Sequence, residues 1–569
     1  MASARSWAPI PILIILLIIT STSSIERSSA AAEQAAGTSV DVVRKFVHIT
    51  DVHLDLSYAT GNAKAECGSP PCCREMHSYL VDPILSTMKE ELRLQMKERG
   101  APKAAEEDAN NSATAAANAE AAEAATRGKR DFAGRYGEYL CDTPAPLLES
   151  AVRASRHLKP DFLVWTGDTG PHIKPGAGHL PRDRLVETIR VASDIIANST
   201  APGLTVVPCL GDHDFSPVGL DPGPRAGSQW LLDAVADAWS RWLTPDAESS
   251  LRARGYYSLP LGGTPALRAI VLNTQECDVL NFYNMVRPGT GSNGEAQLRW
   301  LRDSLRQTED SGESALIVGH IPPGLWNGCY GNFTERYEEV IAEFPRTVSG
   351  QVFGHRHSGA WRVLSDGQGS AGSVALTTPS LTPYKEQDPS FRVYHLNKPE
   401  EGEAAAWPAV RPRLAITAMG QFAANIAGYS DTSGGDLSWK LTFYMPGSLP
   451  FNRTSMAPAQ FQRTADLMLR DLSAQIEYRY REANGRKDMV NELESQYWAC
   501  ALTAIRTRDL IECAHLAEEN LIKFYVNMHH NYVLTNMFPF DVIYGHFCDV
   551  FFNLTGDASC EERKKALLS

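Results

Sequence analysis

The sequence has no excess of positive charge. Its 569 residues include 54 Lys and Arg but 67 Asp and Glu, which gives a formal net charge of -13. Proteins that bind nucleic acid through its phosphates present a basic surface, so we expect no binding to a nucleic-acid duplex. With 43% hydrophobic residues, the chain can still bury a large core.

Long hydrophobic runs are also scarce. The one prominent run, residues 8–19, is shorter than the roughly 20 residues that span a bilayer. It follows Arg5 and leads into small and polar residues up to Ala32, which is the composition of a secretory signal peptide. The sequence therefore predicts a signal peptide at residues 1–32, with an uncleaved membrane anchor as the alternative.

Two further features agree with secretion. Five N-x-S/T sequons predict glycosylation at Asn110, Asn198, Asn332, Asn452 and Asn553. The 11 cysteines suit an oxidising compartment, and the odd one must be free or pair between chains. We expect the protein to be secreted or lumenal, in the extracellular space or in a lysosome- or vacuole-like organelle.

Apolar strands and amphipathic helices alternate along most of the chain. The pattern predicts strands at 42–50, 161–166, 204–210, 267–272, 314–319, 348–354, 373–378 and 391–396, with no further strand. It predicts helices at 182–197, 228–243 and 295–307. This alternation indicates an α/β domain over residues 42–438, with helices covering sheets.

Two segments break the alternation. Residues 101–130 are rich in Ala, Glu and Asn without apolar periodicity, which predicts an exposed insertion, either disordered or a solvated helix. The insertion ends in Arg127-Gly128-Lys129-Arg130, which is either a proprotein-processing site or a solvated charge cluster. Over residues 439–569 aromatic and apolar residues recur at helical spacing, so we expect a mainly helical C-terminal region.

Five short segments place Asp or His directly after an apolar strand. They are Asp51-Val52-His53, Gly167-Asp168, Gly211-Asp212-His213-Asp214, Gly319-His320 and Gly354-His355-Arg356-His357. Strand ends of an α/β sheet converge on one rim, so these distant side chains can meet there. Imidazole and carboxylate ligands together suit Zn, Fe or Mn. One segment alone carries little information, but all five in this order favour a metal site over unrelated turn residues.

The series resembles the calcineurin-like metallophosphoesterases, and within them acid sphingomyelinase and the acid sphingomyelinase-like phosphodiesterases. Longer strings between about residues 45 and 392 carry the narrower resemblance. These are Cys67-Gly-Ser-Pro-Pro-Cys72-Cys73-Arg74, Tyr136-Gly137-Glu138-Tyr139, Cys141-Asp142, Trp165-Thr-Gly-Asp168 with His172, Gly319-His320-Ile-Pro-Pro-Gly324 and Asp388-Pro-Ser-Phe-Arg392. The resemblance implies a four-layer α-β-β-α sandwich that hydrolyses a phosphodiester substrate, such as a nucleotide or a lipid head group.

The resemblance also implies two divalent metal ions, zinc in this branch, which activate a water for attack on phosphorus. One ion would be held by Asp51, His53 and His357, and the other by Asp212, His320 and His355. Asp168 would lie between the two ions. His213 and His172 match the family's proton donor and transition-state residues, and the sequence leaves open which of them protonates the leaving group.

Disulfide pairings follow from the same resemblance. It implies Cys67–Cys72, Cys73–Cys141 and Cys277–Cys329. Cys500, Cys513, Cys548 and Cys560 allow three pairings, of which we favour Cys500–Cys513 and Cys548–Cys560. Cys209 is left over, and we expect a buried free thiol.

The sequence departs from the family at two points. Asp212 stands where the family has Asn, which adds a negative charge where a phosphate must bind. Only residues 33–41 separate the predicted signal from the first predicted strand, so we expect no saposin-like lipid-presenting domain. This favours soluble phosphodiesters or nucleotides over sphingomyelin in bilayers. We expect a monomer whose membrane contact is at most peripheral.

Three alternatives stand beside a zinc phosphodiesterase of this kind. One is a true sphingomyelinase that works without a saposin domain. Another is an endopolyphosphatase, which shares much of the pattern but normally lacks the counterparts of His213 and His357, both present here. The third is a non-catalytic binding protein on the same scaffold, which only Asp212 favours.

Overall fold

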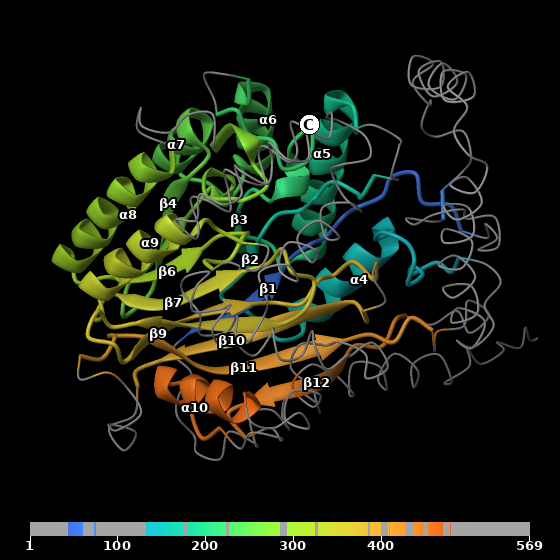
Figure 1. Cartoon of the computed structure of the whole chain (residues 1–569). Helices are drawn as coiled ribbons and strands as arrows, with labels where there is room; N and C mark the ends of the chain where they lie inside the picture. The colour runs from blue at the N-terminus through green and yellow to red at the C-terminus, as the bar shows by residue number, and fades with distance from the viewer. Residues whose placement is uncertain are drawn as a thin grey trace, which may run out of the picture.

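Two six-stranded β-sheets form the centre of the protein (Figure 1). The computed structural model describes residues 44–60, 73–74, 133–173, 179–223, 227–284, 293–324, 328–384, 387–399, 408, 410–427, 429, 436–447, 453–469 and 478. The predicted signal at 1–32, the predicted insertion at 101–130 and most of the predicted C-terminal region lie outside these residues.

The first sheet has the strand order β12-β11-β10-β1-β2-β3. Its strands are β1 (Arg44–Ile49), β2 (Phe162–Trp165), β3 (Thr205–Pro208), β10 (Ser390–Asn397), β11 (Ala415–Ala423) and β12 (Lys440–Met445). Strands β1, β2 and β3 run parallel, whereas β10, β11 and β12 are joined by antiparallel pairing. The carboxyl ends of the three parallel strands therefore reach the same edge of the sheet.

The second sheet has the order β4-β5-β6-β7-β9-β8. Its strands are β4 (Tyr257–Gly262), β5 (Leu267–Val271), β6 (Ser314–Val318), β7 (Val348–Phe353), β8 (Ala360–Ser365) and β9 (Ala371–Thr377). Strands β5, β6, β7 and β9 are parallel, and the edge strands β4 and β8 are antiparallel to their neighbours.

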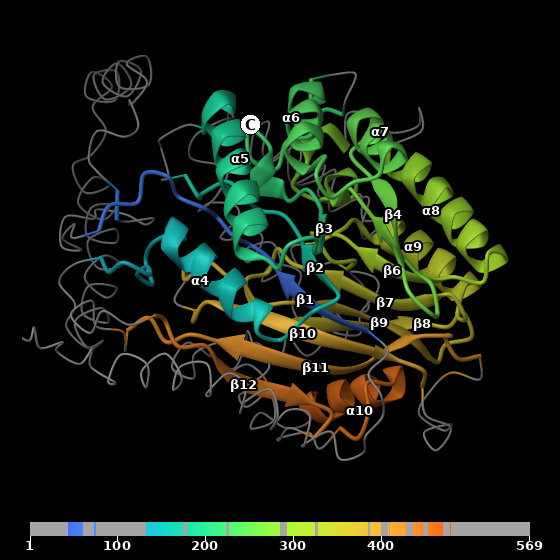
Figure 2. The ribbon, with the colours of Figure 1, turned by 180° about the vertical axis from the view of Figure 1, so that it is seen from behind.

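Helices lie on both sides of the pair of sheets (Figures 1 and 2). The helices are α4 (Ala145–Arg156), α5 (Arg182–Ser199), α6 (Gln229–Trp239), α7 (Pro245–Arg254), α8 (Asn293–Asp310), α9 (Gly331–Glu343) and α10 (Pro458–Met468). Helices α4 and α5 lie beside the first sheet, and α8 and α9 lie beside the second. The predicted α/β sandwich is confirmed.

The side chains of β5 show why the layers stack in this way. Ala269 and Val271 belong to the large core, whereas Ile270 between them joins a second core that includes Leu301 and Leu305 of α8. Successive side chains of a strand point to opposite faces, so an unbroken apolar run is buried on both. The second sheet is thus covered on one face by helices and on the other by the rest of the sandwich.

The expectation of no further strand is wrong. The structure adds β4, β8, β11 and β12 to the eight predicted strands. Strand β4 contains Pro260 and Gly262, which suit an edge position but carry little strand signal. Strand β11 contains Gly420, where a Cβ would lie 3.1 Å from Leu441 and 3.2 Å from Val393. Close packing between strands, rather than side-chain propensity, forms this part of the sheet.

Strand β12 lies beyond the predicted domain boundary at residue 438, yet it pairs with β11 in the first sheet. Helix α10 follows and packs against β8 and β9. The described part of the predicted C-terminal region therefore contributes one strand and one helix to the sandwich. Among the described residues, no helix is both long and apolar enough to cross a membrane.

Two disulfides join described cysteines as the family resemblance implied. Cys73 pairs with Cys141, and Cys277 pairs with Cys329. Cys209 is a buried free thiol. Cys67, Cys72 and the four C-terminal cysteines lie outside the described residues, as do Asn110, Asn452 and Asn553. Asn198 on α5 and Asn332 on α9, the acceptor residues of the other two sequons, are exposed.

We expect limited trypsin digestion to cut first at residues 127–130, because a dibasic site in a low-complexity segment is open to protease. Cys73 and Cys141 lie on opposite sides of this site, so the fragments should migrate together on a denaturing gel until reductant is added. Fragments that separate without reductant would contradict the pairing in solution.

Candidate metal centre

The seven residues predicted to bind metal meet where the carboxyl ends of five strands converge. Asp51 and His53 follow β1, Asp168 follows β2, Asp212 follows β3, His320 follows β6, and His355 and His357 follow β7. None of the seven is more than 9% exposed. Carboxylates this deeply buried need partners of opposite charge or a bound cation.

The first group contains Asp51, His53, Asp168 and His357, whose ligand-type atoms all lie within 4.8 Å of one another. His53 Nε2 is 3.1 Å from His357 Nε2 and 3.3 Å from Asp168 Oδ2. His357 Nε2 is 3.7 Å from Asp51 Oδ1. Two carboxylate oxygens and two imidazole nitrogens thus face one point.

The second group contains Asp168, Asp212, His320 and His355, again within 4.8 Å. His320 Nε2 is 3.2 Å from Asp168 Oδ1 and 3.0 Å from Asp212 Oδ1. His355 Nδ1 is 2.8 Å from Asp212 Oδ1. Asp168 directs Oδ2 to the first group and Oδ1 to the second, so one carboxylate lies between them. The structure brings together the same two sets that the resemblance implied.

The hydrogen bonds that His53 and His320 make on the side away from the cluster indicate that the two ligand groups fit divalent cations. His53 Nδ1 lies 2.9 Å from the carbonyl oxygen of Gly170, and His320 Nδ1 bonds to that of Thr166. A carbonyl only accepts, so each Nδ1 donates its hydrogen there, and in the neutral ring that binds a metal the lone pair of Nε2 faces the cluster. Asp51 Oδ1 is buried and has no hydrogen-bond partner among the described residues. A cation would satisfy that oxygen.

The electrostatics of the cluster also favour a cation. Burial lowers the pKa of His53, but the hydrogen bond and charge of Asp168 outweigh burial and raise that pKa to about 9. Burial raises the pKa of Asp168, but His320 and its neighbours hold it well below its usual range. At Asp51 burial, together with the charge of Asp168, outweighs the neighbouring histidines and raises the pKa. Three carboxylates in one buried site demand positive charge, which divalent ions supply.

The backbone of these loops is held in an unusual conformation. Asp51, His53, Asp168, His355 and His357 all have φ between 40° and 73°. This left-handed region is rarely occupied by residues other than glycine, and it persists only where the surroundings enforce it. The surroundings are tight: a Cβ on Gly354 would lie 1.9 Å from Thr50 Oγ1. Glycine at position 354 therefore lets the loop after β7 meet the loop after β1.

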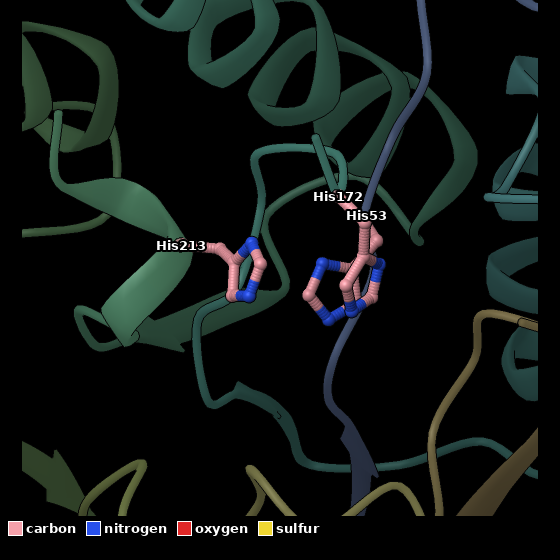
Figure 3. Close-up of side chains that lie close together, drawn as sticks. All are labelled: His53, His172 and His213. Atoms are coloured by element: carbon pink, nitrogen blue, oxygen red, sulfur yellow. The ribbon is translucent and has the colours of Figure 1, made fainter. Parts of the chain in front are cut away.

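The two predicted catalytic histidines lie beside His53 (Figure 3). The ring centroid of His172 is 3.9 Å from that of His53 and 4.6 Å from that of His213. His213 Nε2 is 3.8 Å from Asp212 Oδ2. The ring nitrogens of these three histidines also lie within 4.8 Å of one another, and of the three only His53 belongs to the ligand groups that contain Asp168.

Asp142 positions His172, a role that the sequence did not reveal. Its Oδ1 accepts a hydrogen bond from His172 Nδ1 at 2.7 Å, and its Oδ2 accepts from the His172 backbone N–H at 2.7 Å. Arg74 donates to the same carboxylate at 3.2 Å and to Asp55 at 2.5 Å. Burial raises the pKa of Asp142 to about 6. The only sequence signal was its place next to Cys141 in a family string.

Asp214 is a second residue whose role was missed. Its two oxygens accept from the backbone N–H groups of Thr169 and Gly211, each at 2.8 Å. The carboxylate therefore ties the loop after β2 to the loop after β3, which carry Asp168 and Asp212. The sequence placed Asp214 in a ligand-rich segment, but spacing alone does not separate a ligand from a residue that braces the loop.

The chain is similar to known proteins. The family described as "Calcineurin-like phosphoesterase" matches residues 44–359. "Sphingomyelin phosphodiesterase A" of Dictyostelium discoideum is 27% identical over 478 residues, which are 83% of this chain and 68% of that protein. "Acid sphingomyelinase-like phosphodiesterase 3b" of Mus musculus is 34% identical over 44% of this chain. "Cyclic GMP-AMP phosphodiesterase SMPDL3A" of Homo sapiens is 30% identical, also over 44% of this chain. The alignments span 55% of each of the last two proteins.

Proposed function

Because the chain belongs to the calcineurin-like phosphoesterase family, we propose that it hydrolyses phosphodiesters at the buried Asp and His cluster, with two zinc ions as cofactors. The carboxylate of Asp168 carries this proposal, because it offers one oxygen to each ligand group. Imidazole nitrogen and carboxylate oxygen are both common zinc ligands. A carboxylate shared by two ligand groups is what a two-metal site requires.

Each residue of the cluster has a role in this proposal. Asp51, His53 and His357 would hold one ion, Asp212, His320 and His355 would hold the other, and Asp168 belongs to both ligand groups. Bound there, two divalent ions would lower the pKa of a water and neutralise charge on the phosphoryl oxygens. His172 and His213 provide a proton for the leaving oxygen and a contact to a phosphoryl oxygen. Asp142 holds His172 in one tautomer.

The substrate class follows from what the relatives have in common. Sphingomyelin and cyclic GMP-AMP, after which two of them are named, are both phosphodiesters. We propose that soluble phosphodiesters, either nucleotides or phosphorylated head groups, are the preferred substrates. Sphingomyelin is the second candidate, and the long alignment to the Dictyostelium protein is the reason to include it. The signal-like N-terminus, the exposed Asn198 and Asn332 of two sequons and the Cys73–Cys141 disulfide support a secreted or lumenal protein. The proposal also includes a monomer whose membrane contact is at most peripheral.

Elemental analysis should find about two transition-metal ions per chain, with zinc predominant. His357→Ala should lower the content towards one ion, because it removes a ligand of one group only. The matched control is His157→Ala, which removes an exposed histidine at the end of α4. Less than one ion per chain in wild-type protein never exposed to chelator would contradict the proposal.

A substrate panel tests the specificity. Zinc-loaded protein is given a dinucleotide, ATP, polyphosphate, and sphingomyelin with and without detergent. We expect the dinucleotide to be cut faster than sphingomyelin in detergent-free bilayers. The reverse ranking would favour a sphingomyelinase, hydrolysis of polyphosphate alone would favour an endopolyphosphatase, and no hydrolysis by metal-loaded protein would favour a binding protein.

A further inference from the structure

A chain of buried hydrogen bonds runs from Asp51 into the sandwich. Its members share one property, an exposed fraction of 0%: Thr50, Thr166, His48, Thr378 and Tyr394. His48 lies in β1 and Tyr394 in β10, while Thr166 and Thr378 follow β2 and β9. Because β9 belongs to the second sheet and the other strands to the first, the chain of bonds links the two sheets.

The direction of each bond follows from the number of protons. Thr50 Oγ1 donates its one proton to Asp51 Oδ2, at 2.7 Å. Thr50 must then accept from Thr166 Oγ1, which is 2.7 Å away. Because Thr166 donates its one proton to Thr50, it accepts from His48 Nε2 at 2.8 Å.

The hydrogen bonds on both sides of His48 have the same donor-to-acceptor direction. Burial, together with the positive charges of Arg392 and His320, lowers the pKa of His48 to about 3, so the ring is neutral. A neutral ring with hydrogen on Nε2 accepts at Nδ1, so Thr378 Oγ1 donates to it at 2.8 Å. Tyr394 donates to Thr378 at 2.9 Å. All five bonds therefore point towards Asp51, and aligned hydrogen bonds strengthen one another.

This chain distinguishes the two oxygens of Asp51. Oδ2 accepts from Thr50 and from the backbone N–H of His355, at 3.0 Å. Oδ1 has no hydrogen-bond partner among the described residues and lies 3.7 Å from His357 Nε2. One oxygen is thus fixed by the protein, and the other is directed into the first ligand group.

Thr166 also contacts the second ligand group. Its carbonyl oxygen accepts from His320 Nδ1, which sets the tautomer of that ring. The side chain of Thr166 is therefore connected to Asp51 through Thr50, while its backbone carbonyl bonds to His320. A shift of this one residue would disturb a ligand in each group.

We propose that His48, Thr166 and Thr50 are positioning residues that hold Asp51 as an oriented carboxylate and so set the affinity of the first metal site. The inference rests on the proposed metal binding. Outer partners of metal ligands typically change metal affinity by about 10- to 100-fold. A purely structural role in the core would alter folding stability without changing one metal site selectively.

The test compares two substitutions of one residue. His48→Leu removes both ring nitrogens, whereas His48→Gln keeps one donor and one acceptor. Zinc dissociation constants are measured by chelator competition, and thermal unfolding is measured on metal-free protein. We expect His48→Leu to weaken binding of one ion at least about tenfold. His48→Gln should bind several times more tightly than His48→Leu, while the metal-free proteins unfold at similar temperatures.

A second pair covers the case in which His48→Leu does not fold. Thr50→Val removes the hydroxyl that reaches Asp51, and Thr50→Ser keeps it. Thr308→Val is the control, because it removes an equally buried hydroxyl that bonds within α8. The inference is overturned if Leu and Gln at 48, or Val and Ser at 50, bind zinc equally. If the wild type binds no ion, the metal-site proposal itself fails, which is a different result.

Discussion

Asp212→Asn should raise kcat/KM for a phosphodiester by about a hundredfold at saturating zinc. Burial and Asp168 raise the pKa of Asp212, but His355 and His320 outweigh them and lower it, so the carboxylate is ionised at neutral pH. Its Oδ1 faces His320 and His355, while its Oδ2 lies 3.8 Å from His213 Nε2. A negative charge therefore stands beside a histidine predicted to meet the anionic phosphoryl group.

An amide at this position changes two things. It removes one negative charge from a centre that must bind an anion, and it can place an N–H₂ donor where Oδ2 now lies. One preorganised donor to a developing oxyanion contributes about 3 kcal/mol, which is roughly a hundredfold in rate. The opposing effect is weaker metal binding, because a carboxylate is a stronger ligand for a divalent cation than an amide is.

Both quantities are measured on the same pair of proteins. We expect a higher kcat/KM and a larger zinc dissociation constant for Asp212→Asn than for the wild type. Asp303→Asn is the control, because it makes the same change in charge at an exposed position of α8. A less active Asn variant at saturating zinc would mean that the Asp212 charge assists the reaction, for example by keeping His213 protonated.

The metal cluster could be predicted because its signal is local. Each ligand follows an apolar strand, and parallel strands deliver their carboxyl ends to one edge whatever the register between them. Asp51 and His355 are 304 residues apart, yet both positions are visible as strand ends in the sequence. Their partition into two groups came from the family resemblance, and the structure reproduces it with Asp168 in both.

The supporting residues could not be predicted, because their contacts depend on register and packing. His48 reads in the sequence as an ordinary strand residue, and its partners Thr166 and Thr378 are 118 and 330 residues away. Only the alignment of β1 with β2, and the packing of one sheet on the other, brings them together. Asp142 is similar, since α4 and a disulfide bring it to His172 from 30 residues away.

Asp142→Asn should lower kcat for an alkyl phosphodiester by about a thousandfold. The carboxylate accepts from His172 Nδ1–H through one oxygen, and from the His172 backbone N–H and Arg74 through the other. In Asp142→Asn the amide oxygen must accept from the backbone N–H and from Arg74, so the N–H₂ group faces the His172 ring. An N–H₂ donor there favours the tautomer in which Nδ1 carries no hydrogen. In serine proteases the corresponding change in an Asp–His pair costs about 10⁴ in kcat. Arg74 keeps its pairing with Asp55, so the fold should persist.

Two measurements separate this effect from general damage. Metal content should stay at the wild-type value, because neither Asp142 nor His172 belongs to the two metal-ligand groups that share Asp168. In a His172→Ala background Asp142→Asn should have little further effect, since the two residues act as a unit.

A nitrophenyl phosphodiester tests which histidine donates the proton, because its leaving group needs none. If His172 is the proton donor, Asp142→Asn should reduce hydrolysis of this ester far less than hydrolysis of the alkyl ester. Equal losses for both esters would instead assign His172 to the phosphoryl oxygens and leave His213 as the donor. A variant within threefold of the wild type would show that His172 needs no carboxylate partner.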